Sequence, residues 1–185
     1  VGLSFPELVK QVEEFTASFL KELEAEGALP DMVQVGNEIT NGMIWDEGRV
    51  DGEYNTPQQW EKLAALIAAG VRGVRAVPKE GQPIPVMIHI DRGGDNAGSR
   101  FFFDKLAEFN TDYDIIGLSY YSWWHGTLEE FTDNLYDLAG RYRKPIVVVE
   151  VAYPWTMMSP DEQPLIFNKE EWVYPGFPPT VEGQK

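Results

Sequence analysis

The sequence predicts an α/β protein built on a parallel β-sheet, with about four strands and four helices. Short apolar runs rich in β-branched residues alternate along the chain with longer segments of helical periodicity. The helix-to-strand connections are short, whereas the strand-to-helix connections are long and carry most of the unusual polar and aromatic residues. A (β/α)₈ barrel needs eight strands, so four leave two alternatives, an open sheet or half of a barrel.

The four predicted helices each begin at a recognisable N-terminal signal or follow a turn. Ser4-Phe5-Pro6-Glu7 has the form of a capping box, and the helix that follows should end near Gly27. Thr56 with Pro57 starts the second helix, which runs to about Val77. The third helix covers about 99–109, and the fourth starts at Thr127 and runs to about 140.

The four predicted strands precede or follow these helices in regular order. They are expected at about 32–36, 83–90, 114–120 and 145–150. The connection from Glu38 to Asn55 is long for a simple loop and is therefore expected to have a function. The segment 157–185 contains five Pro and little periodicity, so it is predicted to be a long loop after the fourth strand.

Composition excludes several classes of partner and cofactor. The chain has 185 residues and a formal net charge of -15, so nucleic acid and anionic membranes are unfavourable partners, and a neutral or cationic substrate fits better. There is no Cys, which excludes a thiolate nucleophile and a Cys-ligated metal. No window is apolar enough to span a membrane, and the first residues have neither Met nor the pattern of a signal peptide. We expect the chain to be the interior of a longer protein and to need no cofactor.

Two of the predicted strands end in a glutamate. Val33-Gln34-Val35-Gly36 leads to Asn37-Glu38, and Val147-Val148-Val149 leads to Glu150, which an aromatic loop follows. A single Glu at a strand end is more often a solvated loop residue. Two such residues at the same rim of a parallel sheet favour a catalytic pair, because glycoside hydrolysis uses one carboxyl as acid and another as nucleophile or base.

The alternation of side chains along a strand selects the neighbours of this pair. Ser119 and Tyr121 share one face while Tyr120 points to the other, so Tyr121 is expected to hydrogen-bond Glu150 and Tyr120 to lie in the core. His89 and Asp91 also share a face, although a lone His after an apolar strand is often a core residue.

A metal site formed by Asp91, Asp95 and Asn96 is an alternative. The Gly93-Gly94 pair more simply makes a tight turn, so we expect no metal.

Several segments, in the same order, resemble the endo-β-1,4-galactanases of glycoside hydrolase family fifty-three. The first strand with its Asn37-Glu38 resembles the acid/base strand of that family, and Val148-Val149-Glu150 with Tyr153-Pro154-Trp155 resembles its nucleophile strand. The intervening similarities are Met87-Ile88-His89-Ile90-Asp91 with Gly93-Gly94-Asp95-Asn96, and Ile116-Gly117-Leu118-Ser119-Tyr120-Tyr121 with Trp124-His125-Gly126. Gly176-Phe177-Pro178 with Glu182-Gly183-Gln184 also matches.

The resemblance implies a retaining enzyme with a (β/α)₈ barrel, of which residues 1–185 hold strands four to seven. It implies that Glu38 is the acid/base and Glu150 the nucleophile in cleavage of β-1,4-galactan or type I arabinogalactan. Asn37 would bond the sugar 2-hydroxyl, and His89, Asp91 and Tyr121 would face the substrate. Trp124, His125 and Trp155 are expected to contact the sugar rings, with Trp45 and Trp123 as further candidates for stacking. A secreted location follows from the resemblance alone.

The sequence departs from the family pattern in three places. Val151 stands where Thr is expected after the nucleophile, and Ser122 stands where a Pro is expected after the tyrosines. The segment 157–185 has no cluster of Asp, His and Asn that would predict the calcium site of some bacterial members.

Three alternatives to an active galactanase remain at this stage. They are a mannanase or xylanase of the same clan and a non-catalytic sugar-binding half-barrel. Because four strands cannot close a barrel, we also expect residues 1–185 by themselves to be inactive and to expose apolar surface.

Overall fold

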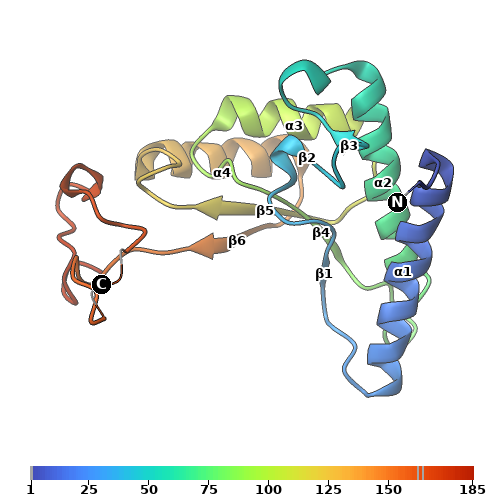
Figure 1. The fold of residues 1–185 in the computed structure, drawn as a ribbon. Helices are drawn as coiled ribbons and strands as arrows, with labels where there is room; N and C mark the ends of the chain where they lie inside the picture. Colours follow the sequence, from blue (N-terminus) through green and yellow to red (C-terminus); the bar gives the residue numbers. More distant parts are fainter. Residues whose placement is uncertain (1, 162, 164) are drawn as a thin grey trace.

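The fold is a four-stranded parallel sheet with four helices on one side, in a computed structural model that describes residues 2–161, 163 and 165–185. The sheet order is β1-β4-β5-β6, and a separate two-stranded hairpin is formed by β2 and β3 (Figure 1). The helices are α1 (Phe5–Ala25), α2 (Pro57–Arg75), α3 (Asn96–Glu108) and α4 (Leu128–Tyr142). The strands are β1 (Val33–Gln34), β2 (Gly42–Met43), β3 (Gly48–Arg49), β4 (Val86–Ile90), β5 (Ile115–Tyr120) and β6 (Ile146–Val151).

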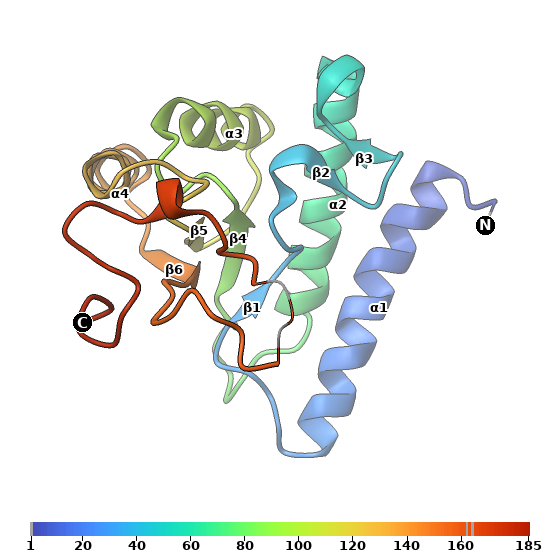
Figure 2. The same ribbon diagram turned by 60° about the vertical axis from the view of Figure 1, so that its left-hand side comes forward.

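The sheet curls into half of a barrel. Parallel pairing brings Val33 beside Val86, His89 beside Gly117, and Ser119 beside Glu150, so the carboxyl ends of all four strands meet at one rim. Helices α1 to α4 follow the outer side of the curl (Figure 2). Of the two alternatives that the sequence left open, the half-barrel is therefore the observed one.

The core lies between the outer side of the sheet and the helices. Every second side chain of β4 and β5 points outward and is fully buried, namely Ile88, Ile90, Ile116 and Leu118. The helices add a chain of edge-to-face aromatic contacts from Trp60 through Phe102 to Phe103. The two central strands are therefore the most completely buried part of the sheet.

Side-chain caps start the helices much as the sequence predicts. The backbone N–H and hydroxyl of Ser4 both donate to the Glu7 carboxylate, and the hydroxyls of Thr56 and Thr127 accept from the third residue of their helices. Helix α3 begins three residues earlier than predicted, because the Asp95 side chain accepts from the Gly98 N–H and caps it.

The largest differences from the predicted elements lie in and after the first strand. Strand β1 has only two residues, since Gly36 adopts φ 80° and turns the chain out of the extended conformation. The predicted loop from Glu38 to Asn55 contains the β2–β3 hairpin between two short 3₁₀ helices, Ile39–Asn41 and Gly52–Tyr54. Helix α4 continues to Tyr142 and ends where Arg143 takes a left-handed conformation.

Strand β6 is an open edge of the sheet. Val148 and Val151 are 36% and 66% exposed, in contrast to the fully buried outward residues of β4 and β5. The chain after β6 contains one short 3₁₀ helix, Glu170–Trp172, and returns to the start of α4, where Tyr174 Oη accepts from the Leu128 N–H and donates to Glu129. Within the described residues, no helix combines the length and the apolar character that crossing a membrane requires.

Candidate active site

Glu38 is placed by an irregular backbone at the carboxyl end of β1. After the turn at Gly36, Glu38 itself adopts φ 46° and ψ 50°, a left-handed conformation that is uncommon for a residue with a side chain. The next residue, Ile39, is 2% exposed and anchors the start of the 3₁₀ helix in the core. The carboxylate is therefore fixed by its neighbours in the chain, at the expense of local strain.

Glu150 is placed by a β-bulge. Leu118 pairs with Val148, but the next residue, Ser119, pairs with Glu150, so Val149 is an extra residue in the ladder. Strict alternation from Val147, which pairs with Gly117 on the inner face, would turn Glu150 toward the outer face. The extra residue returns the carboxylate to the inner side of the half-barrel.

The two carboxylates approach each other over the inner face of β4 and β5. One oxygen of Glu38, one oxygen of Glu150 and one ring nitrogen of His89 all lie within 4.8 Å of one another. Glu38 and Glu150 come from the two outermost strands of the sheet, so the curl of the half-barrel creates this proximity.

Two hydroxyl groups hold the carboxylates. Ser119 Oγ donates to Glu38 Oε1 at 2.6 Å, and Tyr121 Oη donates to Glu150 Oε2 at 2.8 Å. The second hydrogen bond is the one that the strand alternation predicts, and it raises the pKa of Tyr121 because it favours the protonated phenol. Tyr120 lies on the other face as predicted, 4% exposed and stacked on Phe131.

His89 is completely enclosed on the inner face of β4. Its Nε2 lies 2.8 Å from Ser119 Oγ, which links it indirectly to Glu38. Burial lowers the pKa of His89, against the opposing influence of the nearby carboxylates Glu150, Glu38 and Asp91.

Asp91 and His125 form the next part of the rim. Thr40 Oγ1 donates to Asp91 Oδ1, and Arg92 Nη1 lies 3.3 Å from the same oxygen. His125 Nδ1 accepts from the backbone N–H of Tyr121 at 3.1 Å, so its other ring nitrogen is the one free to carry a proton. Burial lowers the pKa of His125, which favours this neutral form.

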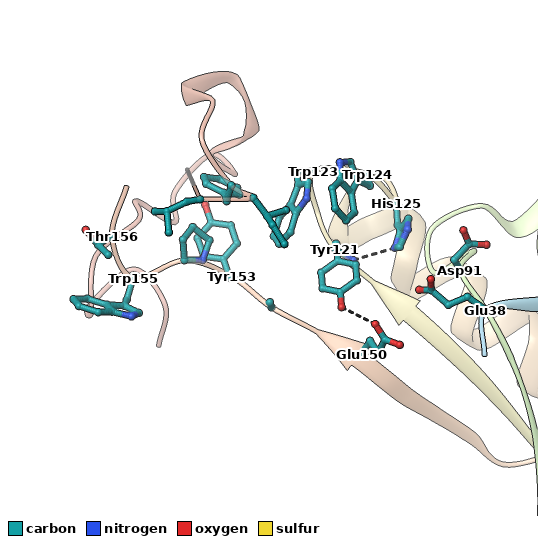
Figure 3. A pocket seen from close by; sticks show the side chains of 15 residues that line it. Glu38, Asp91, Tyr121, Trp123, Trp124, His125, Glu150, Tyr153, Trp155 and Thr156 are labelled. Atoms are coloured by element: carbon teal, nitrogen blue, oxygen red, sulfur yellow. Dashed lines mark hydrogen bonds between the residues drawn. The ribbon is translucent and has the colours of Figure 1, made fainter. Parts of the chain in front are cut away.

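An open cleft of about 800 Å³ runs along this rim. Figure 3 shows its labelled side chains extending from Trp155 at one end to Glu38 and Asp91 at the other, with Tyr121 and Glu150 between them. Trp124 and Trp155 are 55% and 57% exposed, so both present a large apolar surface to solvent in a cleft that also holds two carboxylates. The cleft is lined by Glu38, Asp91, Tyr121, Trp123, Trp124, His125, Glu150, Ala152, Tyr153, Pro154, Trp155, Thr156, Leu165, Ile166 and Phe167.

Seven of the nine residues predicted for the site line this cleft, and two do not. Asn37 is exposed and its side-chain oxygen accepts from Gln34, while His89 lies fully buried beneath the cleft and bonds to Ser119. Trp45 also lies outside, packed against the Arg49 guanidinium. The sequence predicted no role for three further residues of the site, namely Ser119, Thr40 and Tyr153. A role for Ser119 could have been predicted from its position on the same face of the strand as Tyr121.

The residues considered for a metal divide into two groups. Asp95 caps α3, and the Asn96 amide donates to Asn134 and Asp137, so both have structural partners. Glu38, His89 and Glu150 are close enough together to be weighed as ligands, but Glu38 and His89 are both already bonded to Ser119.

Comparison with known proteins identifies the family. The model of Glycosyl hydrolase family 53 matches residues 1–185. The chain belongs to this family. Among curated relatives, "Uncharacterized protein in bgaB 5'region" of Niallia circulans is 57% identical over 98% of this chain and 49% of its own length. "Arabinogalactan endo-beta-1,4-galactanase" of Cellvibrio japonicus is 36% identical over 96% of this chain and 46% of its own length.

A solved structure of the same family has the same fold. The Ignisphaera aggregans GH53 catalytic domain superposes with a TM-score of 0.83 at 36% identity, covering 99% of this chain and 48% of that one. The chain thus spans about half the length of the relatives it matches. The curled sheet is accordingly one half of the TIM barrel of family 53.

Proposed function

We propose that this chain carries the catalytic half of a retaining endo-β-1,4-galactanase, with Glu38 as acid/base and Glu150 as nucleophile. The observation that carries the proposal is the proximity of the two carboxylates, within 4.8 Å between their nearest atoms. Retaining glycosidases place the two carboxyl groups about 5–5.5 Å apart, whereas inverting enzymes leave roughly 6.5–9.5 Å for a water molecule. The substrate class is supported by the name of the Cellvibrio japonicus relative.

The two carboxylates have different surroundings that suit these roles. In the first step, Glu150 attacks the anomeric carbon while Glu38 protonates the departing glycosidic oxygen, which forms a glycosyl-enzyme. In the second step, Glu38 takes a proton from water, and that water displaces Glu150. Tyr121 donates to Glu150 Oε2, which holds the carboxylate in place for attack.

The aromatic residues of the cleft would bind the polymer. Trp124 and Trp155 present exposed rings on which the apolar face of a galactose unit can stack, and His125 lies beside Trp124. Asp91 is the cleft carboxylate closest to Arg92 and is positioned to accept from a sugar hydroxyl. A contact from Asn37 to the 2-hydroxyl and an extracellular location stay predictions.

Residues 1–185 alone should not hydrolyse galactan. Half a barrel leaves β1 and β6 with unpaired edges, and the exposed Val148 and Val151 belong to an apolar surface that solvates poorly. We expect this chain, produced by itself, to bind a hydrophobic dye and to show no turnover. Full activity from a monomer of this chain would contradict the need for the remaining strands.

The test of function uses the full-length protein that contains this chain. We expect it to depolymerise β-1,4-galactan far faster than β-mannan or xylan, with internal cuts that lower viscosity early. Proton NMR of the first products should show the β-anomer before mutarotation, which is the signature of retention. Initial formation of the α-anomer would refute the retaining assignment, and preference for mannan or xylan would refute the substrate.

A further inference from the structure

We propose that His89 and Ser119 form a one-way chain of hydrogen-bond donors that holds the acid proton of Glu38 on its second oxygen, Oε2. The proposal rests on the role of Glu38 as acid/base. It makes Ser119 and His89 positioning residues, which act on the chemistry through Glu38.

Glu38, Ser119 and His89 form a chain of three hydrogen-bonded side chains. Ser119 Oγ lies 2.6 Å from Glu38 Oε1 and 2.8 Å from His89 Nε2, so one hydroxyl bridges the acid and the buried imidazole. A distance of 2.5–2.7 Å is typical of a hydroxyl that donates to a carboxylate. The Ser119 proton is therefore directed at Glu38.

The direction of the Ser119 hydrogen bond fixes the tautomer of His89. A serine hydroxyl has one proton, and once that proton is directed at Glu38, the oxygen can only accept from His89. Nε2 must then carry the hydrogen, and Nδ1 of the neutral ring is left with a lone pair.

The surroundings of His89 agree with this tautomer. Its side chain is fully buried, and Nδ1 has no hydrogen-bond partner among the described residues. A buried lone pair without a donor is tolerated better than a buried N–H without an acceptor, which the opposite tautomer would create. Burial also favours the neutral ring over the charged one, although the carboxylates of Glu150, Glu38 and Asp91 oppose this.

The same chain determines which oxygen of Glu38 carries the proton. A proton on Oε1 would point at the proton of Ser119, so the donor chain excludes it from that oxygen and leaves Oε2 as its site. When Glu38 transfers the Oε2 proton to the glycosidic oxygen, the C1–O bond breaks, and the carboxylate that forms is already hydrogen-bonded by Ser119. The chain thus orients the acid before the step and stabilises its charge during the step.

Kinetics of the full-length protein test the chain directly. Ser119→Ala should lower kcat on galactan roughly tenfold to hundredfold, less than the loss of the acid itself, because general acid catalysis supplies about 10²- to 10⁴-fold and Glu38 is still present. The same variant should lose less than about threefold on a 2,4-dinitrophenyl β-galactobioside, whose leaving group needs no proton. Ser122→Ala is the matched control, because its buried hydroxyl has no partner among the described residues and should change neither rate.

A pair of His89 variants separates positioning from packing. The amide nitrogen of Gln can occupy the place of Nε2 and donate to Ser119, whereas the shorter Asn cannot reach. We expect His89→Gln to retain most of the galactan rate and His89→Asn to resemble Ser119→Ala, with no further loss in the double variant. Nitrogen NMR of the unmodified protein should show His89 protonated at Nε2 and unprotonated at Nδ1.

Distinct outcomes refute this proposal and the underlying function. Equal loss on both substrates for Ser119→Ala, or an Nδ1-protonated His89, would refute the donor chain while leaving Glu38 as the acid. If Glu38→Gln kept its galactan rate, the acid/base assignment itself would fail. A double variant much slower than either single variant would show that His89 acts independently of Ser119.

Discussion

Glu38 and Glu150 at the carboxyl end of the sheet are held differently from the carboxylates at its amino end. At the amino end, Asp114 accepts from Arg75 and from the Val86 N–H, each at 2.7 Å, and Lys79 pairs with Asp31 at 2.7 Å. At the carboxyl end, Glu38 and Glu150 accept from the neutral hydroxyls of Ser119 and Tyr121. Among the described residues, no Lys, Arg or His nitrogen forms an ion pair with either glutamate.

Under the proposed assignment, this difference separates carboxylates that stabilise the fold from carboxylates that take part in the reaction. A guanidinium or ammonium partner holds a carboxylate in its charged form, which suits a stabilising contact. A hydroxyl can donate to the charged form and still tolerate a proton on the other oxygen, which suits a group that must exchange protons. We therefore expect substitutions at the carboxyl end to change rates and substitutions at the amino end to change stability.

The largest effect is expected for Glu150→Ala in the full-length protein. Loss of the nucleophile should lower kcat on every substrate by about 10⁵-fold, as for other enzymes that form a covalent intermediate. Azide can attack from the vacated face, so it should restore turnover and give the α-galactosyl azide, identified by NMR. Formation of the β-azide would show that another group forms the intermediate.

A smaller and substrate-dependent effect is expected for Glu38→Ala. The rate on galactan should fall about 10²- to 10⁴-fold, since proton donation to the leaving oxygen is lost. The loss should nearly vanish in the glycosylation step of a dinitrophenyl galactobioside, measured by the burst of dinitrophenol. Azide should rescue this variant with retention, because the intermediate on Glu150 still forms. An equal fall in rate on both substrates would contradict the assignment of Glu38 as the acid/base.

Tyr121→Phe should have an intermediate effect at the carboxyl end. It removes a hydrogen bond to a charged group, an interaction of about 1.5–3 kcal/mol, so kcat/KM should fall roughly tenfold to hundredfold. The ring and its contacts with Trp123 and Trp124 remain, and the melting temperature should change little. Tyr136→Phe on α4, 77% exposed, is the control and should match the parent enzyme in both measurements.

The smallest effect is expected for Asp114→Asn, at the amino end. Burial alone would raise the pKa of Asp114, but the hydrogen bonds from the Val86 N–H and from Arg75 outweigh burial and hold the pKa below its usual value. A carboxyl with a lowered folded pKa stabilises the fold above the unfolded pKa and loses that contribution as pH falls through the folded value. The Asp114 side chain is 40% exposed, so solvent screens its interactions. Asp114→Asn should therefore lower the free energy of unfolding at pH 7 by about 1 kcal/mol or less.

Urea unfolding at two pH values measures this prediction. The free energy of unfolding should be higher for the parent protein than for Asp114→Asn at pH 7. This difference should shrink below about pH 4, as the Asp114 carboxylate becomes protonated. The galactan rate should be unchanged at pH 7. A tenfold fall in kcat without a change in stability would contradict the division between the two ends of the sheet.

The sequence predicts what depends on local pattern. Helix caps such as Thr56 and Thr127 lie close to the helices they start, and the period of two along β5 correctly separates Tyr121 from Tyr120. The order of four strands and four helices follows from the alternation of apolar runs and helical segments. For these features, neighbours within a few residues determine the outcome.

Features that depend on distant contacts could not be predicted in this way. Ser119 and Glu38 are 81 residues apart in sequence, so their hydrogen bond exists only after the sheet has curled. The bulge at Val149 requires the pairing of β5 with β6, and without it the same alternation would misdirect Glu150. Asn37 is exposed and is not among the residues that line the cleft, which the predicted strand up to Gly36 did not imply.

The left-handed backbone of Glu38 has a practical consequence for capturing a substrate complex. Glycine adopts φ 46° without the clash that any Cβ creates, a difference of about 1 kcal/mol. Glu38→Gly should therefore melt at a higher temperature than Glu38→Ala. Its melting temperature should also equal or exceed that of the parent protein, although it lacks the acid. For a complex with a galactan oligomer that must survive crystallisation, glycine at position 38 therefore combines slow turnover with the more stable backbone, and Glu150→Ala can be added to slow turnover further.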